Sequence, residues 1–303
     1  MPFFLGVMRF ATAGFISAGL ALHSPAALAD GPGVPGTVTG GDVSSPAAEF
    51  ADNPDSVAKV KLTELWQRAV DGDVSPEAYE KAAASWRAAH GISKPEGYQA
   101  LTTTTAASGS TSALAAAAAP PASRTLPLTY YAQIKSYYCG PATGAMLIKI
   151  TNGAIASRYN GASFAQGHLA GPVHMDTESN GATPWASGGF VRGVNRWRGS
   201  NYYVQVDRPS ATLMKSALRQ SIGSNRMPLA ADTVEFKGLR QYNHHPKTLN
   251  IGHWILAYGY ANSGATVKFA DASTPYFTQA AKTFSDVTST FTTTYLQNNG
   301  IAY

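Results

Sequence analysis

The sequence is poor in cysteine: Cys139 is the only one among 303 residues. A single cysteine cannot close an internal disulfide, so the fold has to be stable through its apolar core alone. Charge is also scarce, since charged residues make up 14% of the chain, and the Lys and Arg residues form no run of like charge. These absences argue against a disulfide-stabilised scaffold and against nucleic acid or an anionic membrane surface as the partner.

Long apolar runs are missing after the first 29 residues. Within residues 1–29, one basic residue, Arg9, precedes an uncharged run at 10–22, and the small residues Ala27-Leu28-Ala29 follow. This order is typical of a cleaved secretory signal, whose apolar core is shorter than the roughly 20 residues of a membrane span. We therefore predict a signal peptide at 1–29 and a secreted, extracellular protein without a stable membrane anchor.

Composition divides the rest of the chain into three parts. Residues 30–100 begin with a flexible, Gly- and Pro-rich stretch and continue with two helical patterns, the second capped by Ser75 with Pro76 in its first turn. We predict a small helical hairpin there, which could be a pro-segment, a docking module or a simple extension. Residues 101–126 have the Thr, Ser, Ala and Pro content of a linker. Residues 127–303 are dense in aromatic and aliphatic side chains, which indicates the packed main domain.

Cys139 stands at the start of a predicted helix. The residues after it, 140–150, carry apolar side chains at helical spacing, with Pro141 in the first turn. A helix N-terminus favours a thiolate, so we expect an accessible thiol with a pKa below the ordinary value of about 8.5. Gln133, a short distance upstream, has an amide that can donate to an oxyanion. A buried filler and an intermolecular bridge are the alternatives to a reactive nucleophile.

A nucleophilic cysteine needs a base and a group that orients the base. His253 begins an apolar, aromatic run at 252–260 that predicts a strand, and a second predicted strand at 266–271 ends in Asp271. The two strands form a predicted hairpin that can bring Asp271 beside His253. Alternatively, His253 is an ordinary strand histidine, and Asp271 only caps the turn that follows.

The pair His244-His245 could suggest a metal site. No second cluster of ligands follows at a suitable spacing, and adjacent histidines usually lie on loops. We therefore predict no metal. The aromatic residues at 185–203 are expected to pack in the core rather than to form a platform for carbohydrate.

The motifs "YYCGPAT" and "GHWILAYGY…VKFADAS" resemble the papain-like cysteine peptidases, most closely the bacteriocin-leader (double-glycine) peptidase-like group. The resemblance implies an α+β fold, in which a helix bearing the nucleophile packs on an antiparallel sheet. It also implies that Gln133 is an oxyanion donor, Cys139 the nucleophile, His253 the general base and then acid, and Asp271 the orienting group. No cofactor is needed for such a reaction.

The sequence departs from that group in three places. Tyr138 precedes the cysteine where an acidic residue is more usual, and Ala272 follows the aspartate in place of the usual proline. The interval between the two motifs is long, and an insertion at 157–201 is expected to remodel the substrate cleft.

The resemblance leaves several functions open. The first is a cysteine peptidase that acts on a peptide or protein, with cell-wall peptide as one candidate substrate. A cell-wall amidase, a transpeptidase and a non-catalytic peptide-binding module are the alternatives.

Overall fold

The computed structural model describes residues 53–95, 98–101, 119–151 and 155–303. The predicted signal peptide and most of the predicted linker lie outside these residues. Within them, no helix is both long enough and apolar enough to cross a membrane.

The helical hairpin consists of α1 (Pro54–Asp71) and α2 (Pro76–Ala89), as the sequence predicts. Ser75 caps α2, because its side chain accepts a hydrogen bond from the backbone N–H of Ala78. The hairpin has a small core of its own, which contains Trp66 and Tyr79.

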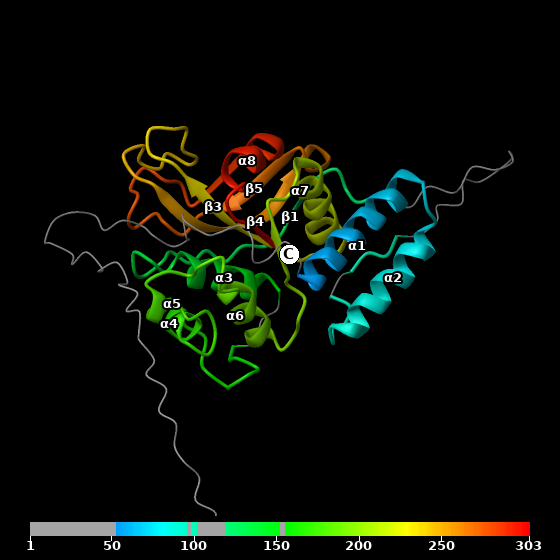
Figure 1. The fold of residues 1–303 in the computed structure, drawn as a ribbon, viewed down its shortest axis with the longest axis horizontal. Coiled ribbons are helices and arrows are strands. Elements are labelled where there is room, and N and C mark those ends of the chain that lie inside the picture. The colour runs from blue at the N-terminus through cyan, green and yellow to red at the C-terminus, as the bar shows by residue number, and fades with distance from the viewer. Residues whose placement is uncertain (1–52, 96–97, 102–118, 152–154) are drawn as a thin grey trace, which may run out of the picture. The chain divides into compact units, whose positions relative to one another are not determined.

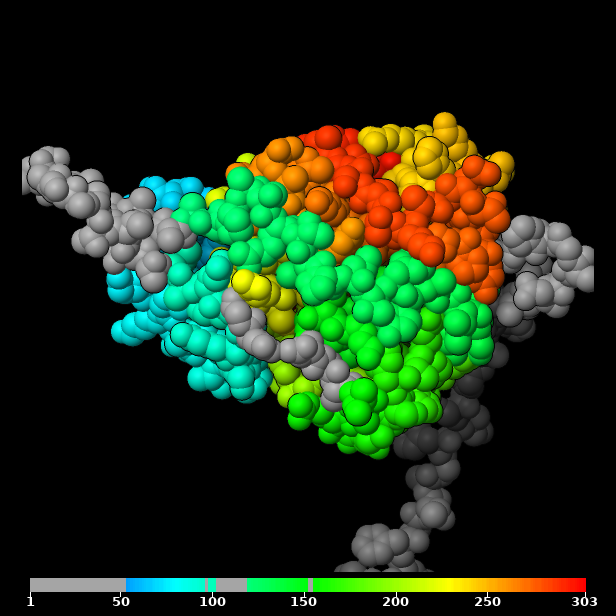
Figure 2. Space-filling view, turned by 180° about the vertical axis from the view of Figure 1, so that it is seen from behind, coloured from blue at the N-terminus to red at the C-terminus, as the bar shows by residue number. Residues whose placement is uncertain are grey.

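The hairpin also packs against the main domain (Figure 2). Thr63 lies at the centre of this contact, where its hydroxyl is hydrogen-bonded to Gln220 and Tyr303. The ammonium of the buried Lys59 lies 4.1 Å from the ring centroids of both Trp86 and Tyr202.

Within the described residues, seven antiparallel strands form one sheet in the order β2-β7-β3-β4-β5-β6, and β1 pairs with β4. The strands are β1 (Arg124–Thr125), β2 (Gln205–Asp207), β3 (Leu229–Glu235), β4 (Ile251–Ala261), β5 (Thr266–Ala270), β6 (Thr283–Val287) and β7 (Gly300–Ala302). The 3-10 turn η2 (Asn262–Gly264) joins β4 to β5 and forms the predicted hairpin.

Helices cover both faces of the sheet (Figure 1). One face carries α3 (Cys139–Ile150) with α4 (Gln166–Ala170), α5 (Thr177–Asn180) and α6 (Gly189–Arg198) beside it; the other carries α7 (Ala211–Leu218), the π-helical turn η1 (Arg219–Ser224) and α8 (Thr288–Tyr295). Alternation along β4 divides its side chains between two cores, with Trp254 and Leu256 on the α3 side and Ile255 and Ala257 on the α7 and α8 side. The fold is therefore the α+β arrangement that the resemblance implied, with the cysteine-bearing helix on an antiparallel sheet.

The aromatic residues at 185–203 pack in the interior, as predicted. Trp185, Trp197, Tyr202 and Tyr203 are all buried in the core on the α3 side. They do not form an exposed platform.

Candidate active site

Cys139 is the first residue of α3, at the position that the sequence predicts. The next residue has to be small, because a Cβ on Gly140 would lie 2.2 Å from the side-chain oxygen of Thr183. The segment around Thr183 therefore packs directly against the first turn of α3. This contact brings part of the segment 157–201, the predicted insertion, to the site.

The thiol of Cys139 is fully buried, with an exposed fraction of 0%. Its Sγ accepts a hydrogen bond of 3.4 Å from the backbone N–H of Trp254, and β4 pairs with β5 only from Leu256 onward. Burial raises the pKa of the Cys139 thiol, and the charges of Asp232 and Asp271 add to the effect. The expectation of an accessible thiol with a lowered pKa is therefore wrong for this conformation, because desolvation outweighs the helix dipole.

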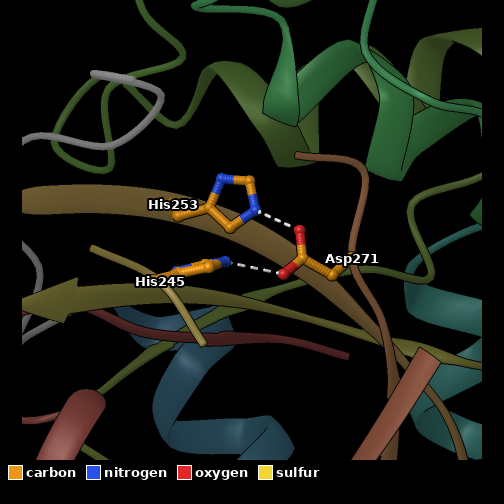
Figure 3. A group of neighbouring side chains, drawn as sticks. All are labelled: His245, His253 and Asp271. Carbon is orange, nitrogen blue, oxygen red and sulfur yellow. Dashed lines mark hydrogen bonds and ion pairs between the residues drawn. The ribbon is translucent and has the colours of Figure 1, made fainter. Parts of the chain in front are cut away.

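His253 and Asp271 meet as the predicted hairpin requires (Figure 3). The Nε2 atom of His253 lies 2.8 Å from Oδ1 of Asp271, and both side chains are buried. Since a carboxylate only accepts hydrogen bonds, Nε2 carries the hydrogen in this contact. The other ring nitrogen, Nδ1, is buried and has no hydrogen-bond partner among the described residues. His253 thus presents an unoccupied nitrogen that can accept a proton.

Cys139 and His253 approach the same peptide bond. The Sγ atom bonds the nitrogen that joins His253 to Trp254, whose side chains point to opposite faces of the strand. In this conformation the thiol is not hydrogen-bonded to Nδ1 of His253. Catalytic hydrogen bonds are often formed only when substrate binds, so the geometry is compatible with a later contact.

The Asp271 carboxylate accepts four hydrogen bonds. Oδ1 receives Nε2 of His253 and the backbone N–H of Ser273 at 2.9 Å, and Oδ2 receives Nε2 of His245 at 2.8 Å and Nδ2 of Asn243 at 2.7 Å. Burial by itself would raise the pKa of Asp271, but the facing His253 and His245 rings hold it well below its usual range. Asp271 therefore both contacts His253 and caps the turn after β5, so the two interpretations of this residue hold together.

His245 is part of the same network, although the sequence only places it, with His244, on a loop. Its Nδ1 atom lies 2.6 Å from Oε2 of Glu235, which ends β3, and its exposed fraction is 3%. Burial opposes a charge on this ring, but the Asp271 and Glu235 carboxylates raise the pKa of His245 to about 9. His244 is exposed in the loop, as expected, whereas His245 turns inward. No periodic pattern marks His245 or Glu235 in the sequence.

The side chains of His245, His253 and Asp271 come close enough together to surround one metal ion. However, the ring nitrogens that face Asp271 lie at hydrogen-bonding distance from its oxygens, and the other nitrogen of His245 is bonded to Glu235. We therefore assign the three side chains to a hydrogen-bonded network.

Gln133 is buried near the start of α3, but its amide does not point freely into the site. Nε2 donates to the backbone oxygens of Lys135 at 3.0 Å and Ser136 at 2.8 Å, which uses both amide hydrogens. Its Oε1 atom is buried without a hydrogen-bond partner in the part of the chain that the structure describes. The role of Gln133 as an oxyanion donor stays a prediction, and in this conformation Gln133 holds its own loop.

A second set of contacts ties this loop to α5. The Glu178 carboxylate accepts hydrogen bonds from Lys135 Nζ at 2.6 Å, from the Tyr137 hydroxyl at 2.9 Å and from the Tyr138 hydroxyl. The residues just before Cys139 are thus fixed from both sides.

The other histidines of the main domain that could serve as the base are bonded elsewhere. The ring of His174 is hydrogen-bonded to Ser157 and to the backbone oxygen of His168, and His168 is bonded to Ser163. Among the described histidines, His253 is the one that directly precedes Trp254, whose backbone N–H donates a hydrogen bond to the Cys139 sulfur.

Comparison with known proteins supports the resemblance that the two motifs carry. No curated protein matches the chain at a significant level. The model of the Peptidase C39-like family matches residues 125–303, which is more than half of the chain and includes Cys139, His253 and Asp271. This protein belongs to the Peptidase C39-like family and has its papain-like α+β fold.

Proposed function

We propose that the protein is a secreted cysteine peptidase or amidase that cleaves peptide or amide bonds through a thioester on Cys139. His253 is the general base and then the acid, and Asp271 positions its ring. Membership of the family indicates a peptidase, and the assignment of roles rests on the contacts of these three residues.

One observation carries the proposal. The Nε2 atom of His253 is bonded to a carboxylate, its Nδ1 atom is unoccupied, and the next residue on the strand bonds the Sγ atom at the N-terminus of α3. Cys139 in α3 and Asp271 after β5 thus both contact neighbouring residues of β4, which supports the roles of nucleophile, base and orienting group. An ordinary strand histidine would not need an unsatisfied buried nitrogen, which costs free energy.

The resting thiol is neutral, since burial raises its pKa. The reaction therefore begins with transfer of the thiol proton to Nδ1 of His253 as sulfur attacks the carbonyl carbon. The carbonyl oxygen takes the electron pair and is held by the backbone N–H of Cys139, which has no acceptor within α3. Collapse breaks the C–N bond, and the imidazolium gives its proton to the leaving amine. Water then hydrolyses the thioester, again with His253 as the base.

The substrate is a peptide or protein, with cell-wall peptide as one candidate. A transpeptidase would use the same three residues, with an amine in place of water in the last step. The acceptor therefore distinguishes the two reactions.

A second candidate is a secreted module that binds peptides without cleaving them. It is favoured by the burial of Cys139 and by Gln133, whose amide hydrogens are both occupied. A protein that never uses its thiol has no need to expose it.

Labelling with a peptide-based electrophile that acylates or alkylates active-site thiols separates the two. We expect the folded wild-type protein to be labelled at Cys139 and His253→Ala to react far more slowly, with His168→Ala as the matched control that keeps the wild-type rate. Equal rates for wild type and His253→Ala would show that His253 is not the base. Labelling only after unfolding in urea would favour the peptide-binding module.

A further inference from the structure

His245 is held between two buried carboxylates. Its Nδ1 atom lies 2.6 Å from Oε2 of Glu235 and its Nε2 atom 2.8 Å from Oδ2 of Asp271. The Ser273 hydroxyl lies 3.2 Å from the same Nε2 atom. Glu235 is fixed in turn, because its Oε1 atom accepts the backbone N–H of Tyr242. The four side chains form a chain from Glu235 through His245 and Asp271 to His253.

These distances require one extra proton. A neutral imidazole has one N–H and one lone pair, and a lone pair that faces a carboxylate oxygen at such a distance is repelled. A hydrogen must therefore lie in both contacts of His245. Asp271 already accepts three other hydrogen bonds. Hence His245 and Glu235 together hold one proton more than a neutral ring and a free carboxylate.

The surroundings of His245 favour retention of this proton. The ring packs against Tyr242, Phe277 and the ring of His253. Without the extra proton, Glu235 and Asp271 would be two buried negative charges beside a neutral ring, which is costly in a desolvated site. The neighbouring phenol of Tyr242 stays neutral, since burial holds its pKa far above the ordinary value.

The cations near His245 do not replace the proton. A cavity of about 390 Å³ adjoins His245 and is lined by Arg240 and Lys247 among others. Arg240 is paired with Asp286, and neither Arg240 nor Lys247 is hydrogen-bonded to Glu235 or Asp271 in the described part of the chain.

We propose that His245 is a second positioning residue of this site, bound as an imidazolium between Glu235 and Asp271, which fixes Asp271 and moderates its pull on a proton at His253. The proposal rests on the proposed function, because it assigns His245 a role in a reaction at Cys139. The second imidazole shares the Asp271 charge. Asp271 can therefore orient His253 while leaving Nδ1 of that ring free to accept the thiol proton.

Nitrogen NMR of the full chain labelled with 15N-histidine shows which ring nitrogens of His245 carry a hydrogen, and it needs no substrate. We call the placement of this imidazolium between Glu235 and Asp271 the bridge. We expect both ring nitrogens of His245 to be protonated at neutral pH. Near pH 9 the ring should lose one of these two protons and become neutral. His245→Asn identifies the signals. In Glu235→Gln the ring should be neutral, with its hydrogen on Nε2, because the amide Nε2 of the new glutamine can donate to Nδ1. His244→Asn, a change at the exposed neighbouring residue, should leave the His245 signals unchanged.

Kinetics test the positioning role. His245→Asn should lower kcat by roughly tenfold to a hundredfold, as is typical when a group that orients a functional side chain is removed. In Glu235→Gln and His245→Asn, the acid limb of the kcat/KM profile should move to higher pH, whereas His244→Asn keeps the wild-type profile. If His245→Asn does not fold, Glu235→Gln carries the test, because it preserves size and can accept the Tyr242 N–H.

The outcomes separate this proposal from the proposed function. A neutral His245 that titrates near the ordinary value of about 6.5 would overturn the bridge, whatever the activity. An active enzyme whose pH profile is unchanged in Glu235→Gln would overturn the positioning role. A wild-type protein that holds both protons on His245 but turns over no peptide would support the bridge and overturn the proposed function.

Discussion

The two halves of the candidate site are built differently. In the base half, the carboxylate of Asp271 accepts four hydrogen bonds, two of them from His253 and His245. In the nucleophile half, the sulfur of Cys139 contacts backbone N–H groups, those of Trp254 and Gly140, and Gln133 uses its amide hydrogens on its own loop. We call the base half assembled, because its side chains are already hydrogen-bonded to one another. We call the nucleophile half closed, because its thiol is buried and does not contact the base.

The difference bears on how the site would work. The four hydrogen bonds to Asp271 hold the carboxylate in place, because any movement of it would leave a buried donor unsatisfied. The thiol is restrained less strongly, because sulfur is a weak hydrogen-bond acceptor and its contact with the N–H of Trp254 is 3.4 Å long. Under the proposed function, we therefore expect the thiol rather than the His253 ring to move when the two come into contact.

The largest effect is expected when the side chain of either Cys139 or His253 is removed. Cys139→Ala should abolish turnover because it removes the covalent partner, and His253→Ala should come close to the same loss because base and acid roles both depend on that ring. Steady-state kinetics with a cleaved peptide measures both, and circular dichroism checks that the fold is retained. Turnover by His253→Ala at the wild-type rate would show that the base is another residue, outside the assembled half.

Asp271→Asn should lower kcat by about 10⁴-fold and leave measurable activity, since the ring of His253 is still present but is no longer held in the productive tautomer. Asparagine also has an NH2 group in place of one carboxylate oxygen, so the two donors that bond to this oxygen lose their acceptor. We expect urea unfolding to show a loss of about 1–3 kcal/mol. Asp73→Asn, on the exposed end of the hairpin, is the matched control. A loss of activity no larger than that of the control would show that the network does not act on His253.

The sequence predicts the assembled half better than the closed one. The strand periodicity of 252–260 and 266–271, with a short turn between them, was sufficient to bring Asp271 to His253, because neighbouring strands of a hairpin meet through local structure. The helical pattern after Cys139 was equally sufficient to place the residue at the start of α3. Both conclusions depend only on residues that are near one another in the chain.

The sequence could not reveal the contacts between distant segments. Thr183, from the predicted insertion at 157–201, packs on Gly140, the residue after the cysteine. His245 joins the site because an irregular loop turns inward to meet Glu235 at the end of β3. Neither contact leaves a periodic trace, so both required the three-dimensional structure.

Gln133→Ala should lower kcat/KM on the order of a hundredfold if its amide stabilises the oxyanion. Its structural contacts suggest a second effect, since the loop at 135–136 would lose two hydrogen bonds. Gln166→Ala is the informative partner variant, because Gln166 fixes the same segment through Ala132 and Ile134 without a proposed contact to substrate. A loss mainly in kcat that exceeds that of Gln166→Ala supports the oxyanion role. Equal losses, with faster alkylation of Cys139 in both, would show that Gln133 only holds the loop.

The smallest effect concerns the free energy of unfolding at high pH. It measures the contribution of the buried Cys139 thiol alone. Below its unfolded-state pKa of about 8.5, the thiol is protonated in both states and adds no pH dependence. Above that value the unfolded chain releases the proton, while the buried thiol keeps it because burial raises its pKa. The free energy of unfolding should therefore fall by about 2 kcal/mol more in wild type than in Cys139→Ala between about pH 8 and pH 10.

The comparison with Cys139→Ala removes the contributions of other groups. The pKa of His245 is raised to about 9, so its contribution to the free energy of unfolding is also lost as pH rises through that value. Burial lowers the pKa of Lys59 to about 7, so its contribution to the free energy of unfolding increases as pH rises. Both are present in the two proteins, so the difference between the two slopes reports the thiol alone. Urea unfolding at several pH values measures it. Parallel slopes would mean that Cys139 ionises as readily in the folded chain as in the unfolded one, and the nucleophile half would then be open rather than closed.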